Sequence, residues 1–459
     1  MEFELNGMDN IEQTSYAAVL DRVQQYMTDN YSEMLKENAT SDEVKGDSTE
    51  LYDKERQIKR NIEIYIKENE IVCSEETHIS ALSARLYNSM CRYDFLTPYI
   101  MDDKFIEENH IEEINGNSWN AIYVTDKNGT HLIKEHFPSP THAINTLNAL
   151  ATRLDKTLNR TTPIFLGEIR KNIRIACSVA PVVDAEQAVN FSIRIVSLAN
   201  FTREDLIKKG TADDIMLNFL EMCISHNVNI CFSGATFSGK TGSLGYLLSY
   251  IAKNSDKRIG TIEIEAREFN ILRFDESGNA LNNVFNWCTR ESANERLNIT
   301  SDTLEELILR FSPEIIAIGE MRNKEALITC EIGTTGHTVI TTTHSGSAAD
   351  SYDRIVRLCK KSRMGYDDDT LYRLALRAFP IICFQKRCMD KSRKITEIIE
   401  GTGYKDGVVE YRTLFHYEVE SSTKELVSGK FVHDNGISDW LKKSLLNNEA
   451  SKSEVDEFC

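Results

Sequence analysis

The feature that most constrains this chain is the stretch over residues 228–243, VNICFSGATFSGKTGS. Residues 228–232 are mostly apolar or β-branched, as in a buried strand, and residues 244–251 have the spacing of an amphipathic helix. Between them lies a GxxxxGKT loop. In such loops the glycines let backbone N–H groups turn towards phosphate oxygens, and the helix N-terminus adds partial positive charge. The stretch therefore predicts a phosphate-binding loop between a strand and a helix.

Each residue of this loop is a candidate for contact with a nucleotide. We expect Lys240 to reach the β- and γ-phosphates and the Thr241 hydroxyl to bind Mg²⁺. The alternative is a chance match in a polar turn, which the flanking strand and helix disfavour. The candidate nucleotide-binding residues are Gly234, Ala235, Thr236, Phe237, Ser238, Gly239, Lys240, Thr241 and Gly242.

Length and charge restrict the class of protein. A chain of 459 residues is too long for one ordinary core and predicts two main domains with appendages. The formal net charge of −18 argues against a surface that coats nucleic acid or anionic lipid. The 11 cysteines show no CxxC pair and no ligand spacing near histidines, which predicts reduced thiols in a cytosolic protein rather than a zinc site. The first residues lack the basic and apolar regions of a signal peptide, and no 18 apolar residues run together, so we expect a chain that is neither exported nor spans a bilayer.

The order of apolar patterns predicts five segments. An acidic helical extension covers 1–94, an α+β domain 95–197, a linker 198–207, an α/β domain 208–420 and a polar tail 421–459, whose last twenty residues we expect to be frayed. The helices of the extension are expected at 15–36, 49–68 and 75–93, either as a packed unit or as a partly mobile appendage. In the α/β domain, strands at 258–264, 315–318 and 338–342 alternate with helices, as in a doubly wound sheet. Segments 380–385, 394–400 and 408–417 predict a terminal antiparallel meander.

Carboxylates follow two of these strands. Glu320 comes directly after the apolar strand 315–318, and open parallel sheets bind ligands at the carboxyl ends of their strands. We interpret Glu320 as a group that contacts a Mg²⁺-bound water or activates water; the alternative is a surface glutamate that caps the next helix. Glu263, Glu265 and Glu268 lie around the end of another strand, either as a water-positioning cluster or as charge on an exposed strand end.

Histidines and arginines complete the candidates. His337 and His344 flank the strand 338–342, so they lie at opposite ends and cannot form a metal pair. His344 is a candidate phosphate sensor because its end of the strand faces the predicted site, although a lone histidine is often structural. Arginines could stabilise charge on the transferred phosphoryl group. The candidates are Arg174 and Arg194 in the first domain and Arg290, Arg310 and Arg322 in the second.

Taken in order, four stretches resemble the Walker A, Asp-box, Walker B and His-box motifs of the type II/type IV secretion ATPase superfamily. They are SGATFSGKT, TIEIEAREF, SPEIIAIGEMR and GTTGHTVITTTHSGSA. Upstream, IEEINGNSWNAIYV, the stretch around Arg174 and NFSIRI near Arg194 are similar to the N-terminal domain of that family. The resemblance covers about residues 15–417 and is strongest to the tight-adherence (Flp) pilus assembly ATPases.

The resemblance implies a RecA-like P-loop ATPase domain preceded by a PAS-like α+β domain and a small helical leader. It also implies ATP and Mg²⁺ as cofactors, a homo-hexameric ring, and docking on an inner-membrane platform protein, with the chain in the cytoplasm and peripheral to the membrane. Matched residue by residue, Lys240 and Thr241 would bind phosphate and Mg²⁺. The Walker B glutamate would be Glu320, the His-box residue His344, the Asp-box acids Glu263 and Glu268, and the arginines presented to nucleotide Arg174 and Arg194.

The sequence departs from the family pattern at four positions. Ala235 and Phe237 replace loop glycines, Gly242 follows Thr241, and Ile264 stands where the family has an acid, which Glu265 could replace by a shift of one residue. Three functions therefore stay open: an ATP-hydrolysing motor for pilus assembly or secretion, a non-hydrolysing nucleotide-gated scaffold, and a DNA-translocating motor. The acidic composition gives the last no support, so direct nucleic-acid binding is not expected.

Overall fold

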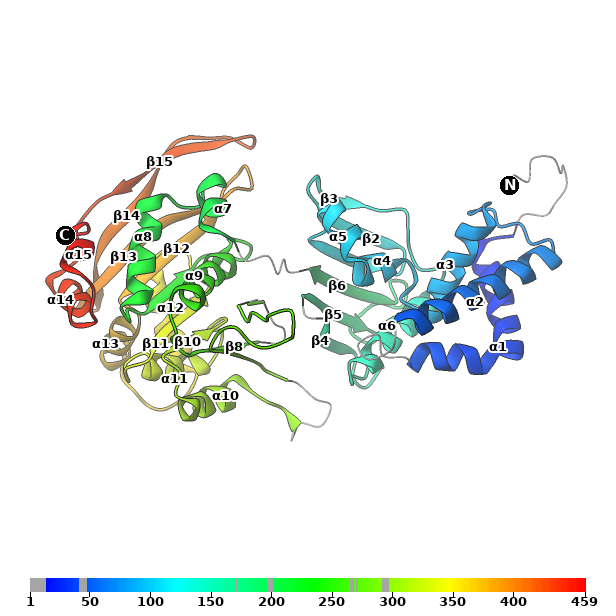
Figure 1. Cartoon of the computed structure of the whole chain (residues 1–459), viewed down its shortest axis with the longest axis horizontal. Coiled ribbons are helices and arrows are strands. Elements are labelled where there is room, and N and C mark those ends of the chain that lie inside the picture. The colour runs from blue at the N-terminus through cyan, green and yellow to red at the C-terminus, as the bar shows by residue number, and fades with distance from the viewer. Residues whose placement is uncertain are drawn as a thin grey trace. The chain divides into compact units, whose positions relative to one another are not determined.

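The computed structural model describes residues 14–40, 48–170, 172–195, 201–264, 268–269, 271–290 and 297–459. The chain divides into two compact units, Met1–Val196 and Ser197–Cys459. Figure 1 shows their elements with the labels used below. Within the described residues, no helix combines the length and the apolar character needed to cross a bilayer. The expected α/β class is confirmed by the sheets and helices of both units.

Three helices begin the first unit. They are α1 (Tyr16–Thr40), α2 (Ser48–Glu68) and α3 (Ile79–Cys91). The apolar stripe of α1, which includes Val19 and Val23, is buried in one cluster with Ile62 of α2 and Leu86 of α3. Because each helix covers the apolar face of the others, the described helices form a packed unit with its own core rather than a loose appendage.

The rest of the first unit is an α+β layer. Its elements are α4 (Thr97–Met101), α5 (Asp103–Asn109), β1 (Glu113–Ser118), β2 (Ala121–Asp126), β3 (Gly129–Leu132), α6 (Pro140–Arg153), β4 (Ile164–Arg170), β5 (Ile173–Val179) and β6 (Val189–Ile195). The sheet has the order β3-β2-β1-β6-β5-β4. Strands β1 and β2 pair antiparallel after the chain reverses between Ser118 and Ala121, and β2 pairs with β3 across the turn before Gly129.

The second unit is built on a nine-stranded sheet of order β15-β14-β13-β12-β7-β11-β10-β8-β9. The strands from β12 to β9 in this order run parallel, and β12 to β15 form the expected antiparallel meander. The strands are β7 (Ile230–Ser233), β8 (Ile259–Glu263), β9 (Val284–Cys288), β10 (Ile315–Ile318), β11 (Thr338–Thr343), β12 (Ile381–Arg387), β13 (Arg393–Lys405), β14 (Val408–Ser422) and β15 (Val427–His433). The helices are α7 (Arg203–Lys208), α8 (Asp214–Ser225), α9 (Lys240–Asn254), α10 (Ser301–Ile308), α11 (Glu325–Ile332), α12 (Asp350–Lys360), α13 (Asp368–Ala378), α14 (Asp439–Asn447) and α15 (Lys452–Asp456).

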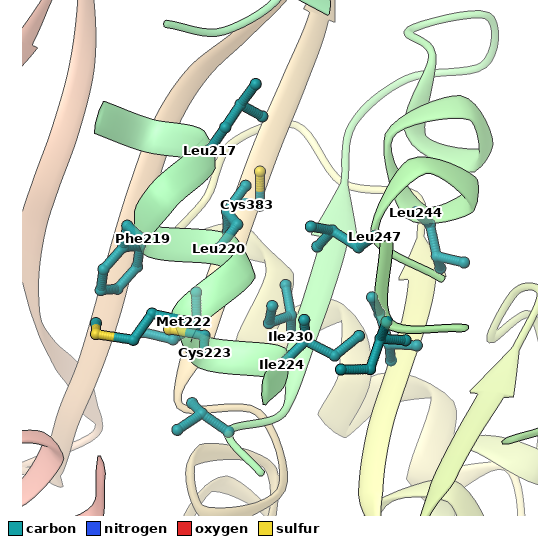
Figure 2. Close-up of a cluster of buried hydrophobic side chains, with 14 of the residues drawn as sticks. Leu217, Phe219, Leu220, Met222, Cys223, Ile224, Ile230, Leu244, Leu247 and Cys383 are labelled. Carbon is teal, nitrogen blue, oxygen red and sulfur yellow. The ribbon is translucent and has the colours of Figure 1, made fainter. Parts of the chain in front are cut away.

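Strand β7 is buried on both faces of this sheet. Ile230 belongs to one core cluster with residues of α8 and α9, whereas Cys231 belongs to a second cluster with residues of α10 to α13. Figure 2 shows Ile224 of α8 and Leu247 of α9 beside Ile230. Because helices cover both faces, the sequence of β7 is almost continuously apolar. The loop that follows β7 is therefore held on a rigid strand.

The expected polar, frayed tail is wrong. Residues 421–459 contain the end of β14, then β15, α14 and α15. Leu441 and Leu445, one helical turn apart on α14, are fully buried with Val455 and Phe458 in the cluster that covers the α8 face of the sheet. These four apolar side chains supply the packing that holds this polar segment in place.

Substitution of Leu441 by alanine is expected to lower the free energy of unfolding of the second unit by about 2–5 kcal/mol, because it leaves a cavity in that cluster. Urea unfolding followed by far-UV circular dichroism measures this change. The control is alanine at the neighbouring Trp440, whose side chain is 56% exposed and whose loss should change stability by less than about 1 kcal/mol. Equally small changes in both variants would contradict the packed tail.

Candidate functional site

The candidate site begins with the loop between β7 and α9. Gly234 and Gly239 have φ angles of 142° and 98°, which L side chains rarely adopt. A Cβ at Gly234 would lie 2.0 Å from the carbonyl oxygen of Gln385 on β12. Gly234 therefore satisfies two requirements at once, a left-handed backbone and close packing against the next strand.

Lys240, the first residue of α9, folds back into its own loop. Its side chain is only 7% exposed, and Nζ donates hydrogen bonds to the carbonyl oxygens of Gly234 and Ala235, each at 2.9 Å. The same Nζ lies 3.4 Å from Nδ1 of His344, which follows β11. The loop thus encloses an ammonium group at the carboxyl ends of two adjacent parallel strands.

His344 links the lysine to Glu320. Nε2 of His344 lies 3.1 Å from Oε1 of Glu320, and Nη2 of Arg322 lies 2.9 Å from Oε2. Burial alone would raise the pKa of Glu320, but its interactions with His344 and Arg322 outweigh burial and lower the pKa to about 2. Glu320 is therefore a carboxylate throughout the neutral pH range.

Hydrogen bonds to both neighbouring strands fix the position of Glu320 at the end of β10. The N–H of Gly319 donates to the carbonyl oxygen of Ile262 on β8, and the Thr342 hydroxyl on β11 donates to the carbonyl oxygen of Gly319, both at 2.8 Å. The chain leaving β10 is thus bound on both sides, and Glu320 emerges beside His344 at the edge where open parallel sheets bind ligands.

Glu263 lies at the end of β8, next in the sheet to β10. It is 2% exposed, and its Oε2 accepts hydrogen bonds from the backbone N–H groups of Glu268 and of Phe269, the latter at 2.9 Å. The carboxylate therefore closes the loop that carries Glu268. These contacts give Glu263 a structural role in addition to the predicted catalytic one, while Glu265 lies outside the described residues.

Arg174 and Arg194 face each other in the first unit. They are register partners on β5 and β6, with Glu168 of β4 opposite Arg174 and Glu113 of β1 opposite Arg194. The sheet thus places the two predicted arginines side by side and flanks them with carboxylates on neighbouring strands.

The structure accounts for two departures from the family loop. Phe237 has a φ of 62° and is 42% exposed, so its side chain points outwards from a left-handed position that costs a non-glycine residue roughly 1–2 kcal/mol. At Gly242, a Cβ would lie 2.7 Å from the ring of Phe201, which packs on the first turn of α9. A larger residue at 242 would therefore displace the ring of Phe201.

Three neighbours of the loop were not predicted from the sequence. Gln385, 1% exposed at the end of β12, accepts a hydrogen bond from the Ser243 hydroxyl at 3.0 Å. Arg393 on β13 donates from Nε to the carbonyl oxygen of Phe237 at 3.1 Å. Phe201 is the third. Of these three, only Gln385 could have been found from the sequence, as a polar residue that ends an apolar strand. His337 has a structural position instead, because its Nδ1 lies 2.8 Å from the carbonyl oxygen of Pro313.

The loop residues fit an anionic phosphate group. Ser238 is fully buried, and its hydroxyl has no hydrogen-bond partner among the described residues. Gly239 precedes α9 without a side-chain cap, so the N–H groups of the first turn are open to an anion. Thr241 is the second residue of α9, where its hydroxyl could join phosphate oxygens around Mg²⁺. No cluster of three or more His, Cys, Asp or Glu residues in the described ranges could hold a metal by itself, so Mg²⁺ would depend on the phosphates.

These features define an α/β protein with a GxxxxGKT loop between a central parallel strand and the following helix. Comparison with known sequences gives the family. The family described as Type II/IV secretion system protein matches residues 155–378. Over these residues the chain belongs to the type II/type IV secretion ATPase superfamily.

Individual relatives are distant and match in part. Competence protein ComGA of Bacillus subtilis is 28% identical over 188 residues, 40% of this chain and 47% of ComGA. The type IV pilus assembly ATPase PilB of Thermus thermophilus is 29% identical over 190 residues, 41% of this chain and 19% of PilB. The chain spans less than half the length of either relative. Among solved structures, the Legionella pneumophila ATPase DotB is 19% identical, with a TM-score of 0.45 over 65% of this chain and 79% of DotB.

Proposed function

We propose that this chain is an ATP-hydrolysing motor that powers pilus assembly or secretion at the cytoplasmic face of a membrane. The observation that carries the proposal is the convergence of Lys240, His344 and Glu320 within 3.4 Å contacts at the carboxyl edge of the sheet. Phosphoryl transfer to water requires a cation on the phosphates and a group that positions the water, which the buried ammonium and the ionised carboxylate at this strand edge can supply.

Each residue has a role in this proposal. Lys240 and the open N–H groups of α9 bind the β- and γ-phosphates, and Thr241 supplies a hydroxyl to Mg²⁺, which would neutralise phosphate charge. Glu320 orients the attacking water. His344 lies 3.1 Å from Glu320 and 3.4 Å from Lys240, so it couples the carboxylate to the phosphate-binding lysine. Glu263 and Glu268 shape the neighbouring loop, and Arg174 and Arg194 would offset charge on the transferred phosphoryl group.

The wider assembly is also a proposal. We assign the second unit to the RecA-like fold, because β11 lies between β7, which carries the loop, and β10, which carries Glu320. The first unit is assigned as a PAS-like domain with a helical leader. We also propose a homo-hexamer that docks on an inner-membrane platform protein of a tight-adherence-type pilus; the similarity to the type IV pilus assembly ATPase PilB supports a role in pilus assembly.

One observation favours a second function, a scaffold that binds nucleotide without hydrolysing it. Phe237 has a left-handed backbone at a position where the family usually has glycine, and its side chain is partly exposed at the mouth of the loop. A bulky side chain there could slow the closure that hydrolysis requires while leaving phosphate binding intact.

Steady-state phosphate release by the full chain separates the two functions. We expect release that needs both ATP and Mg²⁺ and stops when EDTA removes the metal. Mass measurement in solution, with and without ATP, is run on the same sample and should give a hexamer. Tight ATP binding by an intact ring without phosphate release would favour the scaffold, and a monomer under all conditions would contradict the ring.

A further inference from the structure

Arg393 lies against the outside of the loop, on the side away from Glu320. Its Nε donates to the carbonyl oxygen of Phe237 at 3.1 Å, and its Cδ lies 3.0 Å from the position that a Cβ on Gly239 would take. In the part of the chain that the structure describes, neither Nη atom of Arg393 has a hydrogen-bond or ion-pair partner. The outer edge of the guanidinium is therefore available beside the loop.

The hairpin that carries Arg393 gathers positive charge. Arg393 on β13 is the register partner of Arg387 on β12, and the next pair along is Lys394 with Lys386. Like charges directly opposite each other destabilise a sheet, so such a pairing gains from an anion nearby. Lys394 is held by the Gly210 carbonyl oxygen at 3.2 Å. No described carboxylate forms an ion pair with Arg387 or Arg393, which leaves their charge uncompensated.

The turn of this hairpin is fixed in place. Asp390 accepts hydrogen bonds from the N–H of Ser392 at 3.0 Å and from the N–H of Val427 on β15 at 2.7 Å. On the other strand, Gln385 is buried against the loop and bonded to Ser243. Arg393 therefore projects from a rigid element, as a group that must meet a ligand in one geometry does.

We propose that Arg393 contacts the phosphate chain of the bound nucleotide from the same subunit, on the side of the loop opposite Glu320 and His344; this rests on the proposed function. The sheet order supports the arrangement, since β12 and β11 flank β7 on opposite sides. The γ-phosphate faces Glu320 and His344, so Arg393 meets the α- or β-phosphate. These phosphates are present in ADP and in ATP alike, and the contact acts on binding rather than on hydrolysis.

The test is equilibrium binding of ADP and of ATP with Mg²⁺ to the full chain, wild type and Arg393→Gln, over a range of NaCl concentrations. We expect the variant to bind both nucleotides roughly tenfold to a hundredfold more weakly, by the same factor, because it loses a charge-assisted hydrogen bond. Its affinity should also depend less on salt, because one charge contact is gone. Arg393→Lys should recover part of the affinity and part of the salt dependence, because it restores the positive charge.

The matched control is Lys391→Gln, which removes one positive charge from the exposed turn of the same hairpin and should bind as wild type. Unchanged affinity in Arg393→Gln overturns the contact. The contact is also overturned if Arg393→Gln loses affinity with an unchanged salt dependence and Arg393→Lys recovers none of that affinity. Such a result would mean that Arg393 only positions the loop. If the wild-type chain binds neither nucleotide, the proposed function fails, and this contact with it; normal binding by wild type and by Arg393→Gln rejects only the contact.

Discussion

Replacement of Lys240 by alanine is expected to weaken ATP and ADP binding by roughly a hundredfold or more, because the change removes the only charged group enclosed by the loop among the described residues. Hydrolysis should fall to background with it. The alanine variant should still fold, since Ala235 is exposed to water and the carbonyl oxygen of Gly234 keeps its contact with Nδ1 of His344 at 3.2 Å. Titration with a fluorescent ATP analogue measures the affinity.

The control for this substitution is Lys253→Ala on the last turn of the same helix, α9, where the side chain is exposed. It removes the same charge from the same element and should leave nucleotide affinity unchanged. Comparable affinity in Lys240→Ala and wild type, with both proteins folded by circular dichroism, would reject the loop as the nucleotide site.

Replacement of Glu320 by glutamine is expected to separate binding from hydrolysis. The amide is nearly the same size and its carbonyl oxygen can still accept from Arg322, so nucleotide affinity should stay close to that of wild type. It cannot accept a proton from water as a carboxylate does, and the rate of phosphate release should fall by about 10²–10⁴. Binding and single-turnover hydrolysis are measured on the same preparation.

Glu331→Gln on α11 provides the matched control, because Glu331 is exposed on the helix that follows the Glu320 loop. Its phosphate release should equal that of wild type. Equal rates in wild type and Glu320→Gln would remove Glu320 from its assigned role, and loss of both binding and hydrolysis would make it a structural residue.

The residues that converge at the site could be predicted because each follows a short apolar strand. The pattern of β7, β10 and β11 is visible in single stretches of sequence, and parallel strands bring their carboxyl ends to one edge. Lys240, Glu320 and His344 therefore lie together for a reason that the sequence contains. The contacts of Glu263 were not predictable in this way, because they depend on how the chain after β8 folds back to its carboxylate.

Neighbours that approach the loop from later in the chain were missed for a related reason. Arg393 is 156 residues from Phe237, and only the pairing of β12 with β7 brings its hairpin to the loop. The wrong expectation of a frayed C-terminal tail has a different cause, because the sequence there does contain helix-capping residues. Ser438 caps α14 ahead of Leu441, and Ser451 forms a capping box with Glu454 at the start of α15. The segment was judged by its polar composition, although the few apolar residues of its two short helices pack into one cluster.

The enclosed position of Lys240 has a consequence for the thermodynamics of ligand binding. A free lysine side chain loses about 2 kcal/mol of rotamer entropy when a ligand immobilises it. Here the side chain is already ordered by two carbonyl oxygens, so that loss belongs to folding. Binding then exchanges carbonyl acceptors for phosphate acceptors, and the loop is preorganised in the sense that rigid binding sites are. Ordering of Lys240 therefore adds little to the entropic cost of nucleotide binding.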